Sequence, residues 1–245
     1  MNPLSHIDPD DPYPESDGQP MADNTEQYEW LVNIKENLEI LFADRPDVFV
    51  AGDLLWYPVP DRRITGPIAP DVLVAFGRPK GRRGSYRQWE EGGIPPQVVF
   101  EVLSPSNSVK EMADKLAFYD LYGVEEYYVY DPARNELGIW IRQGERLKAL
   151  AHVRGWTSPR LRIRFALIDQ SLEIYDPEGQ PFLSSVDLAQ QARDAAAQAA
   201  LESTRAEQER NRADQERDRA EQERERADRL AERLRALGLD PDAGD

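Results

Sequence analysis

The chain has 245 residues, no cysteine, two histidines and a formal net charge of −16. The lack of thiols excludes disulfides and thiolate-bound zinc, and two histidines are too few for a histidine-rich metal site. Any metal must therefore be held by oxygen, which favours Mg²⁺, Mn²⁺ or Ca²⁺. No stretch approaches the ~20 apolar residues of a membrane span, and the N-terminus lacks a signal-peptide pattern. We therefore expect a cytoplasmic protein with no membrane partner.

Composition divides the chain into three parts. Residues 1–23 are rich in Pro, Asp, Ser and Gly, which predicts a flexible, acidic N-terminal arm. Residues 24–186 hold most of the large apolar and aromatic residues and are long enough for a full hydrophobic core. Residues 187–245 are nearly all Ala, Arg, Glu, Gln and Asp, which predicts a charged helical tail.

A helix is predicted to begin after Asn24 and to end near residue 44, because a capping residue precedes leucine and isoleucine at helical spacing. Runs rich in β-branched and aromatic residues then predict strands at 47–57, 71–76 and 97–103. The segment 77–96, between the last two of these, is predicted to be a long, basic loop.

A second helix is predicted between two recognisable ends. Ser108 and Glu111 have the spacing of a capping box, and Gly123 suits the C-terminal cap. Its predicted buried face consists of Val109, Met112, Leu116 and Tyr119. Further strands are predicted at 126–130, 137–142, 146–151, 161–165 and 172–175. This order of elements favours an α/β fold in which helices flank a mixed sheet.

Two of the predicted strands carry a carboxylate where an apolar residue would pack better. Asp71 opens one strand, and Glu101 lies inside the next between apolar neighbours. Two buried carboxylates on adjacent strands are costly unless a cation lies between them. This pair therefore predicts a divalent metal site. Asp53 is a further acidic candidate, although a turn or edge residue beside Gly52 is the favoured interpretation.

Basic residues gather around Asp71 in the sequence. They are Arg62, Arg63, Arg78, Lys80, Arg82, Arg83 and Arg87. A basic island beside a metal site suits a phosphate backbone, and a solvated loop is the alternative.

The carboxylate pair resembles the paired motif of the PD-(D/E)XK nuclease superfamily. The likeness is greatest to a bacterial restriction-endonuclease branch in which the lysine has moved onto the following helix. It is carried by Ala69-Pro70-Asp71, Glu101-Val102-Leu103-Ser104-Pro105, Lys115 and the run 119–128. The superfamily lysine expected two positions after Glu101 is replaced here by Leu103, and Lys115 matches the displaced position.

The resemblance implies a restriction-endonuclease-like mixed sheet flanked by helices. It also implies that Asp71, Glu101 and the Val102 carbonyl hold Mg²⁺ or Mn²⁺, while Lys115 assists hydrolysis. The expected activity is metal-dependent cleavage of DNA phosphodiester bonds. An exposed pair between Lys115 and Glu111, four residues apart, is the alternative for the lysine. A catalytically weak nuclease fold that binds or regulates through its C-terminal helix is the alternative function.

The tail contains a seven-residue repeat that begins at Ala206 and recurs through Ala213 and Ala220 to Ala227. Its seam of Ala and Glu packs poorly in a coiled coil, whereas alternating acids and arginines stabilise a solvated helix. A lone charged helix and a self-associating coiled coil both stay open. The predicted contact patch consists of Leu230, Leu234 and Leu237. A homodimer through this helix or through the nuclease domain is thus possible.

Overall fold

The structure, a computed structural model, describes residues 12–18, 20–168 and 171–236. The chain divides into two compact units, and the boundary between them in the sequence lies between Ser185 and Val186. The first unit contains every strand of the described residues and two of the helices, α1 (Thr25–Leu41) and α2 (Val109–Tyr122). None of the described helices combines the length and the apolarity that a membrane span requires.

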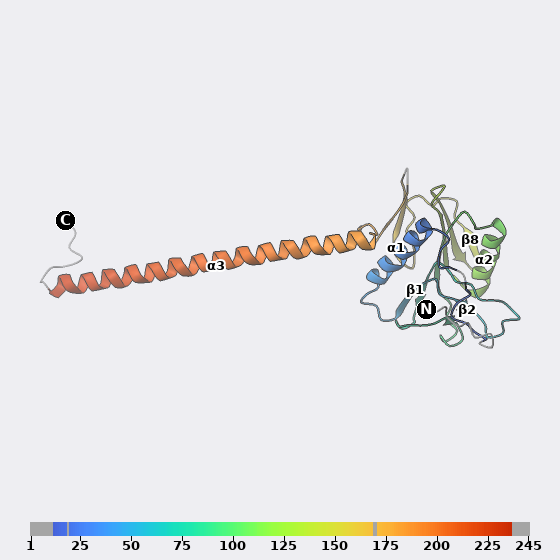
Figure 1. Ribbon diagram of the computed structural model, residues 1–245, viewed down its shortest axis with the longest axis horizontal. Helices are drawn as coiled ribbons and strands as arrows, with labels where there is room; N and C mark the ends of the chain where they lie inside the picture. Colours follow the sequence, from blue (N-terminus) through green and yellow to red (C-terminus); the bar gives the residue numbers. More distant parts are fainter. Residues whose placement is uncertain (1–11, 19, 169–170, 237–245) are drawn as a thin grey trace, which may run out of the picture. The chain divides into compact units, whose positions relative to one another are not determined.

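A six-stranded mixed sheet forms the centre of the first unit in the described part of the chain (Figure 1). Its strands, in spatial order, are β1 (Val48–Gly52), β3 (Val72–Phe76), β5 (Val98–Val102), β6 (Glu126–Asp131), β7 (Glu136–Gln143) and β8 (Arg146–Ala149). The pair β5–β6 is parallel and is joined through α2, while all the other neighbours are antiparallel. The predicted α/β class, with helices flanking a mixed sheet, is confirmed.

Two hydrophobic cores lie on opposite faces of this sheet because successive strand residues point to opposite sides. The side chains of Val98 and Phe100 in β5 pack in the core that α1 covers. The side chain of Val99 packs in the other core, with Phe118 and Tyr119 of α2. Glu101 follows Val99 by two positions and therefore faces α2.

Two small two-stranded sheets in the described residues complete the fold. They are formed by β2 (Trp56–Tyr57) with β4 (Tyr86–Arg87) and by β9 (Arg164–Leu167) with β10 (Leu172–Tyr175). The predicted loop 77–96 thus contains a short strand.

Two predicted boundaries and one predicted buried residue are corrected. The strand predicted at 47–57 breaks after Gly52, since Asp53 adopts a left-handed backbone conformation with φ of 47°. The strand predicted at 161–165 begins only at Arg164, because Arg162 also has a positive φ, of 62°. Val109, predicted to be buried, is 90% exposed because it is the first residue of α2.

The ends of α2 show why this helix has a fixed place against the sheet. At its start, Ser108 and Glu111 form the predicted capping box. At its end, Gly123 adopts the left-handed conformation, with φ of 97°. The guanidinium of Arg142 in β7 donates to the Asp120 and Val124 carbonyls, both at 2.7 Å. These bonds satisfy carbonyls that the end of a helix leaves without partners.

The described residues of the N-terminal arm lie against the first unit. The Tyr13 ring packs against Tyr57 and Trp89, with centroids 5.5 and 5.1 Å away. The Tyr13 hydroxyl donates to the Pro60 carbonyl at 2.8 Å, and the Tyr57 hydroxyl donates to the Pro14 carbonyl at 2.8 Å. Residues 1–11 lie outside the described part, so flexibility of the whole arm 1–23 stays a prediction.

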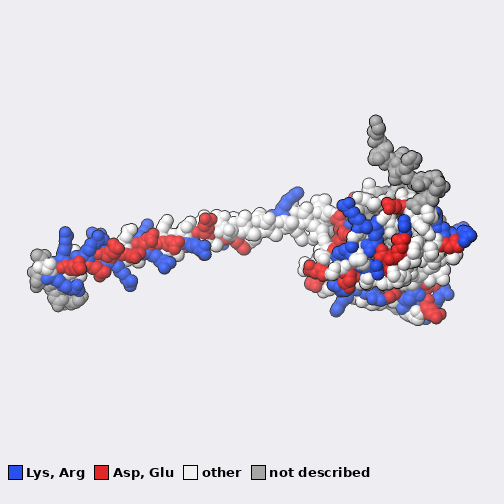
Figure 2. Space-filling model, turned by 90° about the horizontal axis from the view of Figure 1, so that it is seen from below, with Lys and Arg blue, Asp and Glu red and all other residues white. Residues whose placement is uncertain are grey.

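The second unit contains α3 (Ser185–Ala236), in which no described residue is buried. Acidic and basic side chains alternate along much of its surface (Figure 2). Leu230 is 61% exposed, and Leu237 lies outside the described residues. Self-association as a coiled coil stays a prediction.

Replacing Arg142 by Lys should destabilise the first unit by about 1.5–3 kcal/mol, the range for hydrogen bonds that involve a charged group. A single ammonium cannot reproduce the spread of donors that the planar guanidinium directs at several carbonyls. Urea denaturation measures the change. Arg134→Lys is the matched control, because Arg134 forms an ion pair with Asp131 but is 73% exposed. Equal losses in the two variants would contradict the capping role.

Candidate active site

Strand pairing places Asp71 and Glu101 side by side. In the antiparallel ladder of β3 and β5, Val72 is opposite Phe100. One further step along both strands makes Asp71 the cross-strand neighbour of Glu101, a relation in which Cβ atoms lie about 4.5–5.5 Å apart. Both carboxylates belong to the sheet face that α2 covers, and they are only 8% and 3% exposed.

Glu101 is held from α2 by two donors. Lys115 Nζ donates to Glu101 Oε2 at 2.8 Å, and the Tyr119 hydroxyl donates to Glu101 Oε1 at 2.5 Å. Lys115 lies 3.8 Å from Glu111, so its shorter contact is the buried one. The lysine on the helix therefore meets the carboxylate on the strand. Apolar spacing predicts only burial for Tyr119 and cannot reveal where its hydroxyl points.

Asp71 is held by the strand beside it. Its Oδ2 accepts the Val102 N–H at 2.6 Å. The Val102 carbonyl accepts from Gln27 Nε2 of α1 at 3.0 Å. Gln27 is recognisable in the sequence only as a helix-capping residue, and its Oε1 does accept the Asp23 N–H at 2.9 Å. Its second bond, to Val102, depends on the packing of α1 against β5.

The protonation of this group follows from burial and mutual repulsion. Burial, together with the Glu101 charge, raises the pKa of Asp71 to about 8. Burial also raises the pKa of Glu101, although Lys115 and Tyr119 oppose this. Burial lowers the pKa of Lys115, but the ion pair with Glu101 outweighs that effect and the net pKa is raised. The lysine is therefore charged at neutral pH, while the two carboxylates together bind protons more readily than isolated ones.

The donor set is compatible with a hard divalent cation. Among the described residues, no three His, Cys, Asp or Glu side chains are grouped closely enough to hold a metal ion. Mg²⁺, however, commonly binds one or two carboxylates and completes its shell with water and substrate phosphates. Asp71, Glu101 and the Val102 carbonyl supply oxygen donors of this kind, and a cation would relieve the repulsion that raises the pKa of Asp71.

Ser104 and Ser106, just after β5, contact an acidic residue that sequence reasoning did not single out. The hydroxyls of both serines bond to the Asp23 carboxylate, at 2.6 Å from Ser104. These bonds lower the pKa of Asp23, and Lys115 contributes weakly in the same direction. No local pattern marks Asp23, because it meets these serines only when α1 packs on the sheet.

The predicted basic island is partly used inside the protein. Arg78 and Arg83 both pair with Glu91, at 2.8 and 2.6 Å, and their side chains are only 22% and 13% exposed. Arg83 also lies over the Phe49 ring, 3.9 Å from its centroid. Lys80 and Arg82 are exposed. These partly buried arginines therefore hold the loop 77–96 in place, and the exposed residues are better placed for an external phosphate.

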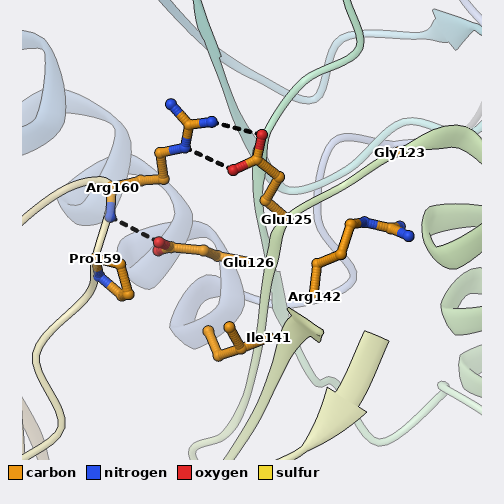
Figure 3. Close-up of a pocket in the computed structure, with 7 residues that line it drawn as sticks. All are labelled: Gly123, Glu125, Glu126, Ile141, Arg142, Pro159 and Arg160. Atoms are coloured by element: carbon orange, nitrogen blue, oxygen red, sulfur yellow. Dashed lines mark hydrogen bonds and ion pairs between the residues drawn. The ribbon is translucent and has the colours of Figure 1, made fainter. Parts of the chain in front are cut away.

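A pocket of about 520 Å³ has lining residues that are all separate from the carboxylate pair (Figure 3). Glu126 within it accepts from Ser158, Tyr128 and the Arg160 backbone. Glu125 pairs with the Arg160 guanidinium at 2.5 Å. Since these charged groups bond one another, we assign them a structural role.

Asp71→Asn should change how the stability of metal-free protein depends on pH. The pKa of Asp71 is near 4 in the unfolded chain and about 8 in the folded protein. The protonated carboxyl therefore contributes its full stabilisation below about pH 4, and this contribution is lost as the pH rises towards 8. Between pH 5 and 8, we expect wild type to lose about 2–4 kcal/mol relative to Asp71→Asn. Chemical denaturation in EDTA measures this, with Asp44→Asn, an exposed site, as control. Parallel curves would contradict the assignment.

Comparisons with known proteins identify a family. A search of the curated proteins finds no match. One solved structure that resembles the chain is described as a putative nuclease belonging to DUF820 from Anabaena variabilis ATCC 29413. It is 12% identical, and the match covers 56% of this chain and 72% of that one with a TM-score of 0.42. The model of the Uma2 family matches residues 15–168, which include Asp71, Glu101 and Lys115. The chain therefore belongs to the Uma2 family, which is described as "putative restriction endonuclease".

Proposed function

We propose that the protein is a metal-dependent endonuclease that hydrolyses DNA phosphodiester bonds at Asp71, Glu101 and Lys115. The observation that carries this proposal is the 2.8 Å contact between Lys115 and Glu101, beside Asp71 on the neighbouring strand. Membership of a family described as restriction endonucleases supports the same activity. The identity of the nucleic acid rests on this membership and on the exposed basic residues.

In this proposal, the metal is Mg²⁺ or Mn²⁺ and is held by Asp71, Glu101 and the Val102 carbonyl. When bound, the cation polarises the phosphoryl oxygen and lowers the pKa of the attacking water. In the hydrolysis, the water oxygen bonds to phosphorus as the bond from phosphorus to a sugar oxygen breaks. The sugar oxygen takes up a proton, and the attacking water loses one.

The protein side chains supply position and charge. The Lys115 ammonium carries the positive charge that stabilises the additional negative charge of the transition state. Tyr119 fixes one oxygen of Glu101, so the carboxylate keeps its orientation while Lys115 holds the other oxygen. The Gln27 amide fixes the Val102 carbonyl in the same way. These buried contacts pre-organise the group before a substrate binds.

Lys80 and Arg82 are proposed to contact the phosphate backbone. Both are exposed, whereas Arg78 and Arg83 are engaged by Glu91. Contacts of this kind release counterions, so DNA affinity should fall steeply with salt. A homodimer, through the first unit or α3, stays a prediction.

A catalytically weak or inactive nuclease-fold module, which binds or regulates a partner through its C-terminal helix, is the second candidate. The net charge of −16 and the displacement of the lysine from the strand favour it. Such a module would not nick DNA in the presence of either metal.

Purified protein should nick supercoiled DNA with Mg²⁺ or Mn²⁺, and Glu101→Gln should abolish nicking. Lys115→Met should lower the cleavage rate by about 10²–10³, the usual effect of losing one transition-state charge partner. Gel-based nicking assays measure both changes, and circular dichroism checks that the variants are folded.

Lys110→Met is the matched control on the same helix, because Lys110 is exposed. It should cleave like wild type. Equal cleavage by wild type and Glu101→Gln would identify a contaminating nuclease and overturn the proposal.

A further inference from the structure

Asp53, the residue that follows β1, continues the line of carboxylates. In the ladder of β1 and β3, Gly52 is opposite Val72. One more step makes Asp53 the cross-strand neighbour of Asp71, and the Asp53 N–H donates to the Asp71 carbonyl at 3.1 Å. Asp71 is in turn the neighbour of Glu101. We call Asp53, Asp71 and Glu101 the acidic row.

The three members of the acidic row share one face of the sheet. Phe49 and Ala51 of β1 pack in the core that α2 covers, and Asp53, two positions after Ala51, interacts electrostatically with Glu101 and Lys115 of that face. Asp53 is partly buried there. The neighbouring charges agree with this position. Burial, then the charges of Asp17 and Glu101, raise the pKa of Asp53 to about 6, while Lys115 opposes the rise.

A turn residue would be expected to use its carboxylate for local hydrogen bonds. In the described part of the chain, no hydrogen bond or ion pair involves the Asp53 carboxylate. Its backbone adopts φ of 47°, in the left-handed region where only glycine is free of steric strain. The carboxylate is therefore not explained by the turn that it occupies.

An independent observation on Tyr127 of β6 indicates that a small polar ligand belongs near the Glu101 end of the acidic row. Tyr127 is 1% exposed, and its hydroxyl has no hydrogen-bond partner among the described residues. Its ring packs against Tyr119 with centroids 4.9 Å apart, next to the side chain that holds Glu101. The charges of Glu101 and Asp71 reach this hydroxyl, because they contribute, after burial, to its raised pKa. Buried hydroxyls in this situation usually bond to ordered water.

We propose that Asp53 is a further catalytic residue, whose carboxylate accepts a hydrogen bond from the attacking water and holds it against the acidic row. This inference rests on the proposed hydrolysis of phosphodiesters. It does not make Asp53 a metal ligand, in agreement with the absence of a three-residue ligand group from the described residues. The water oxygen still forms the new bond to phosphorus, and no group other than water and the phosphodiester is consumed.

Two substitutions distinguish the effect of the Asp53 carboxylate on cleavage from the effect of its strained backbone. Asp53→Asn keeps a side chain that tolerates the left-handed conformation, and Asp53→Gly removes the strain altogether. Both should lower kcat by about 10²-fold, the lower end for a lost base or orienting group, and should leave KM for DNA unchanged. Both should melt at or above the temperature of wild type, since neither loses a hydrogen bond.

Arg162→Gly is the matched control. Arg162 also has a positive φ, of 62°, but it is exposed and outside the acidic row. It should gain stability in the same way and should cleave like wild type. A loss of cleavage in this variant would assign the effect of Asp53→Gly to backbone flexibility and overturn the inference.

Mn²⁺ binding, measured by electron paramagnetic resonance without DNA, gives a readout other than activity. Asp53→Asn should retain Mn²⁺ binding, whereas Glu101→Gln should lose it. A loss in Asp53→Asn as large as in Glu101→Gln would make Asp53 a ligand and overturn its assignment to the water.

If Asp53→Asn cleaves as fast as wild type while Glu101→Gln is inactive, the inference fails alone. If wild type itself does not cleave, the proposed function fails and the inference fails with it.

Discussion

Two buried carboxylates side by side, Asp71 just before β3 and Glu101 on β5, impose the main constraint on this fold. Desolvation and repulsion both oppose their ionisation, and an uncompensated charge inside a protein costs several kcal/mol. The surrounding elements each supply part of the compensation. The second helix brings Lys115 and Tyr119, and the adjacent strand brings the Val102 N–H. The first unit is thus arranged around a pair of carboxylates that destabilises the folded state. Their presence is therefore not explained by a contribution to stability.

Much of the fold could be predicted from local sequence. The helices α1 and α2 begin at the predicted capping residues Asn24 and Ser108, because caps depend on interactions within a few residues. The apolar runs at 71–76 and 97–103 predicted β3 and β5 for the same reason. Asp71 and Glu101 were recognisable because a charge inside an apolar strand conflicts with local burial. Membership of the family confirms the resemblance carried by these residues.

Features that depend on pairing between distant segments were not predictable. Asp53 was interpreted as a turn residue, and its backbone does end a strand, but only the register of β1 against β3 aligns it with Asp71. The basic island looked uniform in the sequence, yet Glu91 engages two of its arginines. Sequence alone cannot separate arginines that bind a partner from arginines that hold a loop, because the difference depends on which acid folds back onto them.

The packing of Tyr13 has a consequence for the order in which the protein assembles during synthesis. Its ring lies between Tyr57 and Trp89, so its contacts span up to 76 residues, the difference between positions 89 and 13. Because a chain leaves the ribosome from its N-terminus, Tyr13 emerges well before Trp89. The segment around Tyr13 must therefore wait until the loop 77–96 has emerged and folded. Early synthesis and later docking of this segment leave β2 and β4 without its contacts until that loop exists.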